Sequence, residues 1–218
     1  MKRLLRSTTG AGAAEFALVL PVLLMLLFGI IDGGRLLWET NRAEKATQVG
    51  ARMAIVTESL SPGLRDADYA GSTSGGTVIE AGANIPIGAL GTIVCDSKEC
   101  RCEAQPCPSM GTYNSAAFTA LVTRMQKIYP QLTAANVQVR YSGSGLGSAG
   151  DLISTSGGGG GSGGGSTATE QMEVAPLITV SLTGIEFRPI TSLLMATLNL
   201  PDFATTLTAE DVSGSYSE

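Results

Sequence analysis

Residues 11–31 read AGAAEFALVLPVLLMLLFGII, and this stretch decides how the rest of the chain is placed. It holds one charged residue, Glu15, and the sixteen residues that follow Glu15 carry no charge. At about 1.5 Å per residue, a helix over this stretch is about 31 Å long, close to the thickness of a bilayer's hydrocarbon core. A buried helix of a soluble domain would show a polar face, and this stretch shows none. The sequence therefore predicts a transmembrane helix over residues 11–31.

The charges on either side of this helix predict its orientation. Lys2, Arg3 and Arg6 precede the apolar run, whereas the charges that follow it are mixed in sign. Positive charge marks the cytoplasmic side of a membrane helix, so residues 1–10 should stay in the cytoplasm and the bulk of the chain should face the periplasm. The run is longer than the apolar part of a cleaved secretory signal, and no cleavage site of the A-x-A type follows it. A conventional signal peptide is therefore disfavoured, and a plain uncleaved anchor remains an alternative.

Gly10 and Glu15 form a second pattern in front of the apolar run. Gly10 ends a short basic leader, and Glu15 lies five residues further on. A carboxylate at the mouth of a membrane segment is costly, so it is expected to have a partner. Cleavage between Gly10 and Ala11 would make Glu15 the fifth residue, and the freed amine could compensate the acid inside a bundle of apolar helices. The alternatives are a flexible glycine before a helix and an ordinary interfacial acid.

A short basic leader, a glycine, four small residues, Glu-Phe and a long apolar helix resemble the class III signal of type IV pilins. The string GAAEFALVLPVLLMLLFGIIDGGRLLW (residues 12–38) is similar to the TadE-like pseudopilins of the tight-adherence (Tad), or Flp, pilus system, and the resemblance covers residues 6–56. It implies that a prepilin peptidase cuts between Gly10 and Ala11.

The same resemblance implies roles for three further residues and a set of partners. Glu15 is the acid used in subunit assembly, Phe16 the aromatic that follows it, and Pro21 the proline within the helix. The implied partners are the prepilin peptidase, other pilins and pseudopilins, an inner-membrane platform with its assembly ATPase, and membrane lipid. The implied function is that of a minor pseudopilin for assembly of a type IVb pilus, held in the bacterial inner membrane or incorporated in the extracellular pilus. The alternative is a signal-anchored surface module or pilus-tip adhesin.

Beyond the membrane segment, residues 32–60 are predicted to continue as a helical stalk. Small and apolar residues recur there at three- and four-residue steps, and this stripe could pack on other helices or on the chain's own domain.

Pro21 has no N–H to donate to the carbonyl of Ala17, which predicts a bend within the membrane helix. The family's typical, smaller members lack the long irregular region, the cysteine cluster and the glycine tract of this chain. Assignment to the TadE, TadF or TadG type therefore stays open.

Residues 61–218 are predicted to form a periplasmic α+β domain, with the long N-terminal helix packed on a small antiparallel sheet as in pilins. The expected strands are 77–80, 92–95, 137–141, 177–182 and 205–212, with a helix over 114–129 and a short helix or extended rim over 188–200. Residues 157–167 (GGGGGSGGGST) match no phosphate-binding loop and are predicted to be a disordered hairpin loop.

All four cysteines fall within thirteen residues: Cys95, Cys100, Cys102 and Cys107. The spacing does not match a zinc ribbon, and an oxidising compartment favours two disulfides. Three pairings are possible, of which a 95–107 bridge enclosing a 100–102 bridge is the least comfortable.

Composition excludes several classes of function. The chain has no histidine, which removes the usual catalytic base and metal ligand, and paired carboxylates such as Asp66/Asp68 and Glu210/Asp211 stand in surface-like contexts. The net charge of −5 becomes −8 without residues 1–10, so a nucleic-acid partner is not expected. We therefore expect no catalysis, no cofactor and no metal.

Overall fold

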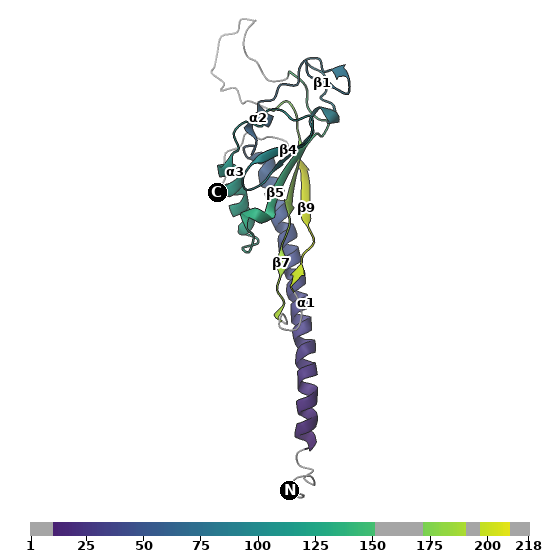
Figure 1. The fold of residues 1–218 in the computed structure, drawn as a ribbon, viewed down its shortest axis with the longest axis vertical. Helices are drawn as coiled ribbons and strands as arrows, with labels where there is room; N and C mark the ends of the chain where they lie inside the picture. The colour runs from purple at the N-terminus through teal and green to yellow at the C-terminus, as the bar shows by residue number, and fades with distance from the viewer. Residues whose placement is uncertain (1–10, 151–171, 191–196, 210–218) are drawn as a thin grey trace, which may run out of the picture. The chain divides into compact units, whose positions relative to one another are not determined.

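The computed structural model describes residues 11–150, 172–190 and 197–209, so the leader, the glycine tract and the end of the chain lie outside the described residues. The fold class is α+β, as the sequence predicts, with a long N-terminal helix and antiparallel sheets (Figure 1). The elements run in the order α1 (Ala11–Val56), α2 (Pro62–Arg65), β1 (Thr73–Ser74), β2 (Thr77–Val78), η3 (Ile87–Ala89), β3 (Thr92–Cys95), β4 (Cys100–Ala104), α3 (Ser115–Gln126), η4 (Ala134–Asn136), β5 (Val137–Ser142), β6 (Leu177–Leu182), β7 (Glu186–Phe187), β8 (Leu198–Asn199) and β9 (Phe203–Thr208).

These elements group into two compact units that share α1. The first unit contains α1 up to Asn41 together with Glu186–Leu200, which carries β7 and β8. The second unit contains Arg42–Ile185 and the chain from Pro201 onward. The sequence placed all of 61–218 in one domain, whereas the structure groups the β7–β8 hairpin with the first part of α1.

The second unit is built on a five-stranded antiparallel sheet in the order β4-β3-β5-β6-β9. Strand β5 alternates buried and half-buried residues, as a strand with one covered face should, and β6 repeats the pattern in register. The buried side chains of these two strands form the centre of the core: Val137, Val139, Tyr141, Ile178, Val180 and Leu182.

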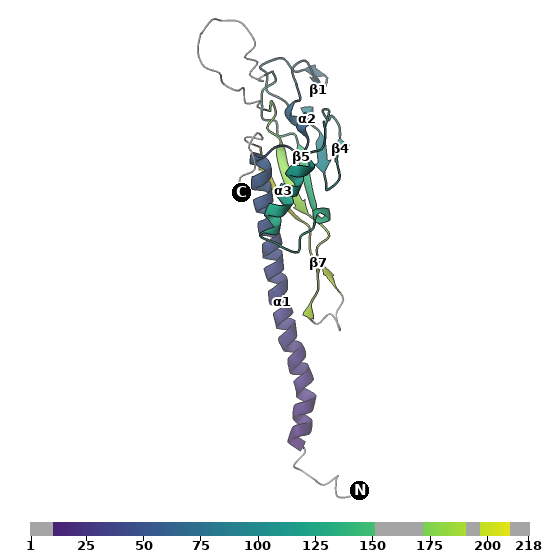
Figure 2. The same ribbon diagram turned by 90° about the vertical axis from the view of Figure 1, so that its left-hand side faces the viewer.

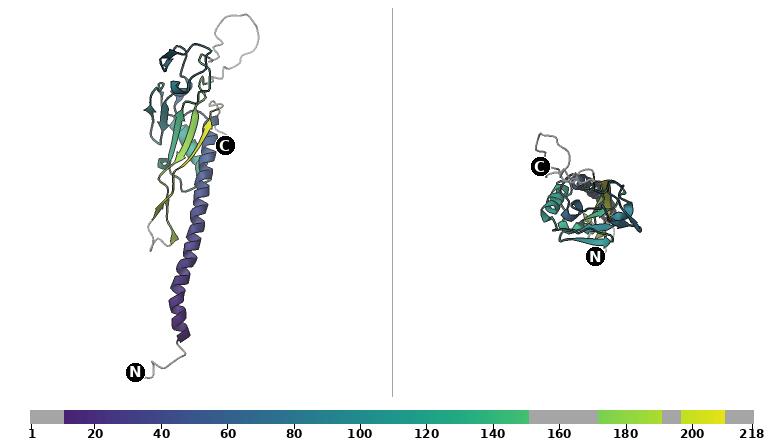
Figure 3. Two further views of the ribbon diagram at one scale, coloured as in Figure 1. Left: turned by 90° about the vertical axis from the view of Figure 1, so that its right-hand side faces the viewer. Right: turned by 90° about the horizontal axis from the view of Figure 1, so that it is seen from above.

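Helix α3 and residues 42–56 of α1 cover this face of the sheet (Figure 2). The Nε of Arg42 donates to the carbonyl of Ile128 at 2.8 Å, just past the end of α3. The hydroxyls of Thr47 and Thr205 lie 3.0 Å apart, which fixes α1 beside β9, the yellow strand of Figure 3. The second unit is therefore a two-layer arrangement of helices on a sheet.

Local signals explain where the elements begin and end. Helix α3 begins after Asn114, whose Oδ1 accepts the N–H of Ala117 at 3.0 Å, so Asn114 is the N-cap of this helix. Helix α1 ends at Val56, four residues before the predicted end. The hydroxyl of Thr57 turns back to the carbonyl of Met53 at 2.9 Å, and the chain then leaves the helix.

Several strands differ from their predicted bounds. Strands β3 and β6 match the prediction, β5 is one residue longer, and β2 covers only the first two residues of 77–80. Strand β9 begins at Phe203 rather than Thr205, and residues 210–212 lie outside the described residues. Within the predicted short helix or rim at 188–200, Leu198–Asn199 form β8 and Leu198 pairs with Phe187; residues 191–196 lie outside the described residues.

A buried carboxylate joins two segments near the glycine tract. Glu173 is 4% exposed; its Oε2 accepts the N–H of Tyr69 at 2.8 Å and its Oε1 accepts the N–H of Gly150 at 3.0 Å. Burial, together with the charge of this carboxylate, raises the pKa of Tyr69 to about 12. Because β5 and β6 pair as neighbours, the tract lies in the connection between two adjacent antiparallel strands.

Candidate functional site: the exposed half of the long helix

The first half of α1 exposes an unbroken apolar surface. Every residue from 12 to 31 is exposed except Leu20, which is half-buried; we call this stretch the apolar half. Its large side chains are 38–76% exposed, with Leu18 the most exposed and Phe28 and Leu24 the least. Exposed apolar surface of this extent marks a membrane or protein contact. Within the described residues, α1 is the one helix long and apolar enough to span a membrane.

Glu15 interrupts the beginning of this surface. It lies just over one turn into α1 and is exposed, as is its neighbour Phe16, at 64%. In the part of the chain that the structure describes, no hydrogen bond or ion pair reaches the Glu15 carboxylate. Ala11, on one side of the expected cleavage point, is the first residue of α1, and Gly10 lies outside the described residues. Glu15 is therefore an acidic residue within an apolar helix, close to the N-terminus that cleavage after Gly10 would create.

Pro21 lies inside α1, and the helix continues through it. Because Pro21 has no N–H, the carbonyl of Ala17 loses its intrahelical donor. Both residues are exposed, so this carbonyl is open to an outside donor. The bend expected at this point stays a prediction.

The surroundings of the glycines in α1 show which part of the small-residue stripe packs on the chain's own domain. A Cβ added at Gly50 would lie 2.7 Å from the Sδ of Met125, so Gly50 packs closely on α3. A Cβ added at Gly29, Gly33 or Gly34 would meet nothing within 4 Å. The stripe therefore packs on the chain's own domain within residues 42–56, which we call the domain half, and the space beside the glycines at 29, 33 and 34 is open.

A cluster of charged residues follows the apolar half in α1 and consists of Asp32, Arg35 and Glu39. Asp32 is 7% exposed, and its Oδ1 accepts the N–H of Ile190 at 2.7 Å and a contact from the Arg35 guanidinium at 3.5 Å. Arg35 also lies 3.8 Å from Glu39, and its guanidinium carbon lies 5.5 Å from the centre of the Phe187 ring. Asp32 and Arg35 are three residues apart in one helix, a spacing at which side chains can pair. The sequence analysis missed Ile190 and Phe187, because partners more than 150 residues away leave no local signal.

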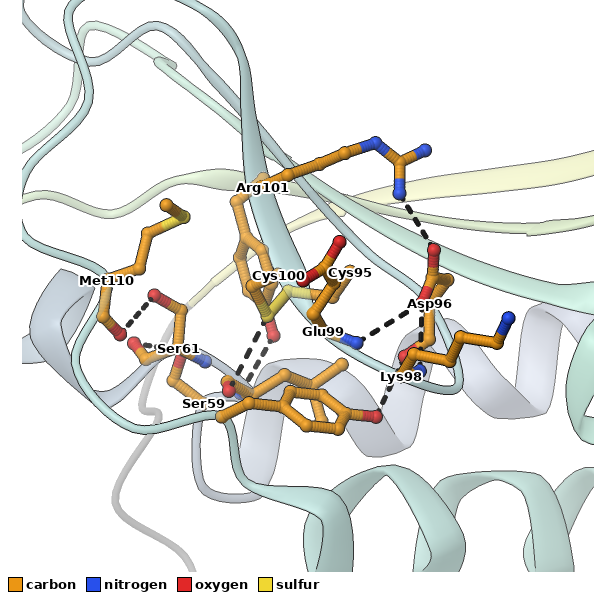
Figure 4. The surroundings of a disulfide bond; sticks show 12 residues. Ser59, Ser61, Cys95, Asp96, Lys98, Glu99, Cys100, Arg101 and Met110 are labelled. Atoms are coloured by element: carbon orange, nitrogen blue, oxygen red, sulfur yellow. Dashed lines mark hydrogen bonds and ion pairs between the residues drawn. A yellow bond between two sulfur atoms is a disulfide. The ribbon is translucent and has the colours of Figure 1, made fainter.

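The four cysteines form two disulfides, Cys95–Cys100 and Cys102–Cys107, so the structure selects the sequential pairing among the three that the sequence left open. The first bridge joins β3 to β4 at directly opposed positions (Figure 4). The second joins β4 to the following loop, and both close five-residue separations. The sequence missed β4 because its apolar content is low; its pairing with β3 makes it a strand.

The turn between the bridged strands is held by Asp96. The Asp96 carboxylate accepts the N–H of Lys98 at 2.8 Å and that of Glu99 at 3.2 Å, and Arg101 donates to it at 2.7 Å. The Lys98 N–H contributes most to lowering the pKa of Asp96, Arg101 and Glu99 add to it, and partial burial opposes them. Burial and then the Asp96 charge raise the pKa of Tyr113, whose hydroxyl donates to the Asp96 carbonyl, to about 12.

The bridged hairpin also contacts the segment that follows α1. The side chain of Tyr141 is buried and its hydroxyl accepts the N–H of Leu60 at 3.2 Å; this burial raises the pKa of Tyr141. Ser61 donates to the carbonyl of Met110 at 2.9 Å, beside the first bridge (Figure 4). The disulfides therefore stiffen a layer on which the end of α1 is seated.

An open groove of about 580 Å³ lies beside this layer, lined by Pro62, Gly63, Asp66, Ala67, Asp68, Pro108, Ser109, Gly111 and Thr112. The Asp66 carboxylate pairs with Arg65 at 2.9 Å. Among the described residues, no group of three or more cysteine, aspartate or glutamate side chains could hold a metal ion.

These features define a class: a protein with one apolar helix suited to a single membrane pass, followed by a disulfide-bonded α+β domain. The family model described as TadE-like protein matches residues 10–52, from the expected cleavage point through Glu15, Phe16 and Pro21 and into the domain half. Over this segment the chain is similar to the TadE-like family, which is the resemblance that the sequence analysis indicated. Neither the curated proteins nor the solved structures contained a match to the chain.

Proposed function

We propose that the protein is a minor pseudopilin for assembly of a Tad, or Flp, type IVb pilus. The observation that carries the proposal is the apolar half of α1, exposed at every residue except the half-buried Leu20 and bearing Glu15 near its start, within the segment matched as TadE-like. A role of this kind depends on packing rather than on chemistry, and it needs no cofactor, metal or catalytic residue.

In the proposed mechanism, a prepilin peptidase first cuts between Gly10 and Ala11. The cut removes Lys2, Arg3 and Arg6, which otherwise hold the start of the helix at the cytoplasmic surface. It also creates a positive amine at Ala11. Without the leader, α1 can leave lipid for a bundle of similar helices, because one apolar environment replaces another.

In this proposal, Glu15 makes the transfer from lipid to the helical bundle selective for subunits whose leader has been cut. In a bundle, its carboxylate would pair with the new N-terminal amine of a neighbouring subunit. A charge pair in an apolar environment is strong when both members are present and costly when one is missing. A subunit that has not been cut would bring no amine and would be rejected.

The two halves of α1 divide the work in this proposal. The domain half is committed to the chain's own core through contacts such as Gly50 with Met125. The apolar half is left for lipid, and after cleavage for the sibling pilins and pseudopilins. The other proposed partners are the inner-membrane platform and its assembly ATPase, which would supply the work of extraction. The proposed location is the inner membrane, with the N-terminus cytoplasmic and the domain periplasmic.

Mass spectrometry of the N-terminus of the membrane-associated protein tests the proposed processing. We expect a mature chain that begins at Ala11, and a Gly10→Val variant that retains residues 1–10. Gly29→Val is the matched control, since this glycine lies in open space in the same helix, and it should be processed normally. A functional native protein that still carries Met1 would overturn the proposal.

The proposed role of Glu15 is tested by Glu15→Gln, which keeps the shape and removes the charge. We expect normal membrane insertion and normal cleavage together with loss of pili, because the amine of the neighbouring subunit is left without a counter-charge. Electron microscopy and recovery of sheared pili measure the outcome. Normal piliation in Glu15→Gln would remove Glu15 from the mechanism.

A second candidate function is a surface-exposed or pilus-tip adhesin. The disulfide-stapled layer and the groove beside it favour this candidate, because they form a stiff surface with an open hollow. Deletion of the protein separates the two functions: loss of an assembly subunit should abolish pili, whereas loss of an adhesin that assembly does not need should leave pili in place and abolish attachment.

A further inference from the structure

The β7–β8 hairpin lies against α1 at the end of the apolar half. Its two anchoring contacts are the hydrogen bond from the Ile190 N–H to Asp32 and the stacking of Arg35 on Phe187. The two strands pair through Glu186 with Asn199 and Phe187 with Leu198. Figures 1 and 2 show this pair of short strands running alongside α1.

The two contacts give the hairpin a direction. Phe187 lies against Arg35, and Ile190, three residues later in the chain, lies against Asp32, about one helical turn nearer the apolar half. The chain therefore runs along α1 from Arg35 toward Asp32, that is, toward the apolar half. Asp32 is the first charge after sixteen uncharged residues, so it marks the level at which α1 leaves the hydrocarbon core. Ile190 lies at that same level.

The side chains of the hairpin suit this level. Ile190 is 52% exposed and Leu198 49% exposed, whereas Phe187 is buried. The side chain of Arg188, two residues before Ile190, is 78% exposed and lies 3.6 Å from the carboxylate of Glu186 at the protein surface; the sequence holds no charge between Arg188 and Asp202. Apolar side chains beside a long cationic one are typical of the membrane interface, where the cation reaches the phosphate groups and the apolar groups enter the lipid.

We propose that the β7–β8 hairpin is a second membrane contact of this protein, with Ile190 and Leu198 in the lipid of the leaflet from which α1 emerges and Arg188 among its phosphates. Asp32 is the positioning residue, because its carboxylate holds the backbone of Ile190 at the end of the membrane helix. The inference rests on α1 spanning the membrane, and it does not depend on pilus assembly or on cleavage of the leader.

Fluorescence quenching in proteoliposomes tests this contact. All four native cysteines are in disulfides, so one added cysteine can be labelled selectively with an environment-sensitive fluorophore. The full chain is labelled at Ile190→Cys, with Leu198→Cys as an independent second position. Leu23→Cys reports the membrane anchor, and Val78→Cys, 57% exposed in the second unit, is the matched control. Vesicles of phosphatidylethanolamine and phosphatidylglycerol carry nitroxide lipids as one quencher, and iodide is the aqueous quencher.

We expect the label at 190 or at 198 to be quenched several-fold more by nitroxide lipids than the label at 78, and several-fold less by iodide. Lipid quenching at 23 with aqueous quenching at both 190 and 198 would overturn the hairpin contact and leave the anchor standing. Aqueous quenching at 23 as well would overturn the anchor and the inference together. Protection of 190 and 198 from both quenchers would mean that protein covers the hairpin, and it would overturn the lipid contact.

The positioning role of Asp32 has its own test in the Ile190→Cys background. Asp32→Ala removes the acceptor for the Ile190 N–H, and we expect the label at 190 to lose lipid quenching and gain iodide quenching. Asp32→Asn retains an oxygen acceptor and should keep most of the lipid quenching. Equal quenching in Asp32→Ala and in the parent would overturn the role given to Asp32.

Discussion

The two halves of α1 belong to one helix and have opposite surroundings. In the domain half, Ala43, Ala46 and Ala51 are fully buried, and a glycine at 50 makes room for a methionine of α3. In the apolar half the large side chains are exposed. Small residues face the chain's own core, and large apolar ones face outward. This reversal shows that the apolar half is shaped for lipid or for another protein, because a soluble helix would place its large apolar residues toward its own core.

Charge insertion should separate the two halves most strongly. Ala46→Arg places a charge at a fully buried position, and we expect it to cost at least about 3–5 kcal/mol and to prevent folding of the domain. Val22→Arg should leave the domain folded and release the protein from membranes, because an arginine near the centre of a membrane helix costs about 3 kcal/mol in insertion. Protease resistance and alkaline extraction of membranes report the two effects separately. Equal loss of domain folding in both variants would contradict the division.

Volume added at the two glycine sites should give a smaller difference. Gly50→Leu forces a side chain into Met125, and overpacking of this kind costs about 1–3 kcal/mol. Gly33→Leu enters open space and gains helix propensity, so the domain should be unaffected or slightly stabilised. Thermal unfolding of the full chain in detergent, followed by circular dichroism, measures both. A destabilised Gly33→Leu domain would show that the open space is occupied.

Removal of a disulfide tests how far the stapled layer supports the domain half. Replacing Cys95 and Cys100 together by alanine removes the cross-link of a short loop, and the expected cost is about 2 kcal/mol. Membrane extraction should not change, because the bridge lies in the second unit. Urea unfolding monitored by the buried tyrosines and by circular dichroism measures the loss. A matching double replacement of Cys102 and Cys107 shows whether the less buried bridge contributes equally.

We expect the smallest of these effects from acid, which should lower the stability of the disulfide-bonded hairpin formed by β3 and β4. Because the pKa of Asp96 is lowered in the fold, its carboxylate stabilises the protein above the ordinary aspartate pKa of about 3.9, and this stabilisation is lost as pH falls through the lower, folded-state pKa. Asp96→Asn should therefore melt at a lower temperature than the parent at neutral pH and at nearly the same temperature in strong acid. A constant difference across that range would assign the effect to shape rather than to charge.

The sequence predicted the parts of the fold that rest on local patterns. Hydropathy located α1, alternation located β5 and β6, and Asn114 marked the start of α3. It did not locate β4, whose register on β3 is set by pairing, and therefore could not choose among the disulfide connectivities.

The candidate site divides in the same way. Glu15, Phe16 and Pro21 lie within seven residues of the chain and were predicted together from one resemblance; the structure places all three on exposed positions of α1, and their roles stay predictions. The contact of Asp32 with Ile190 joins residues 158 positions apart, and Ile190 was placed only within a short helix or rim. Only the fold brings them together.

The carboxylate of Glu173 accepts the N–H groups of Gly150 and Tyr69. A change in the length of the chain between positions 150 and 173 should therefore leave the pairing of β5 with β6 intact. When the two ends of an insert are fastened independently, doubling its length adds only about 0.6 kcal/mol of closure entropy. This makes the stretch a natural place to splice in an epitope or a reporter peptide without disturbing the sheet.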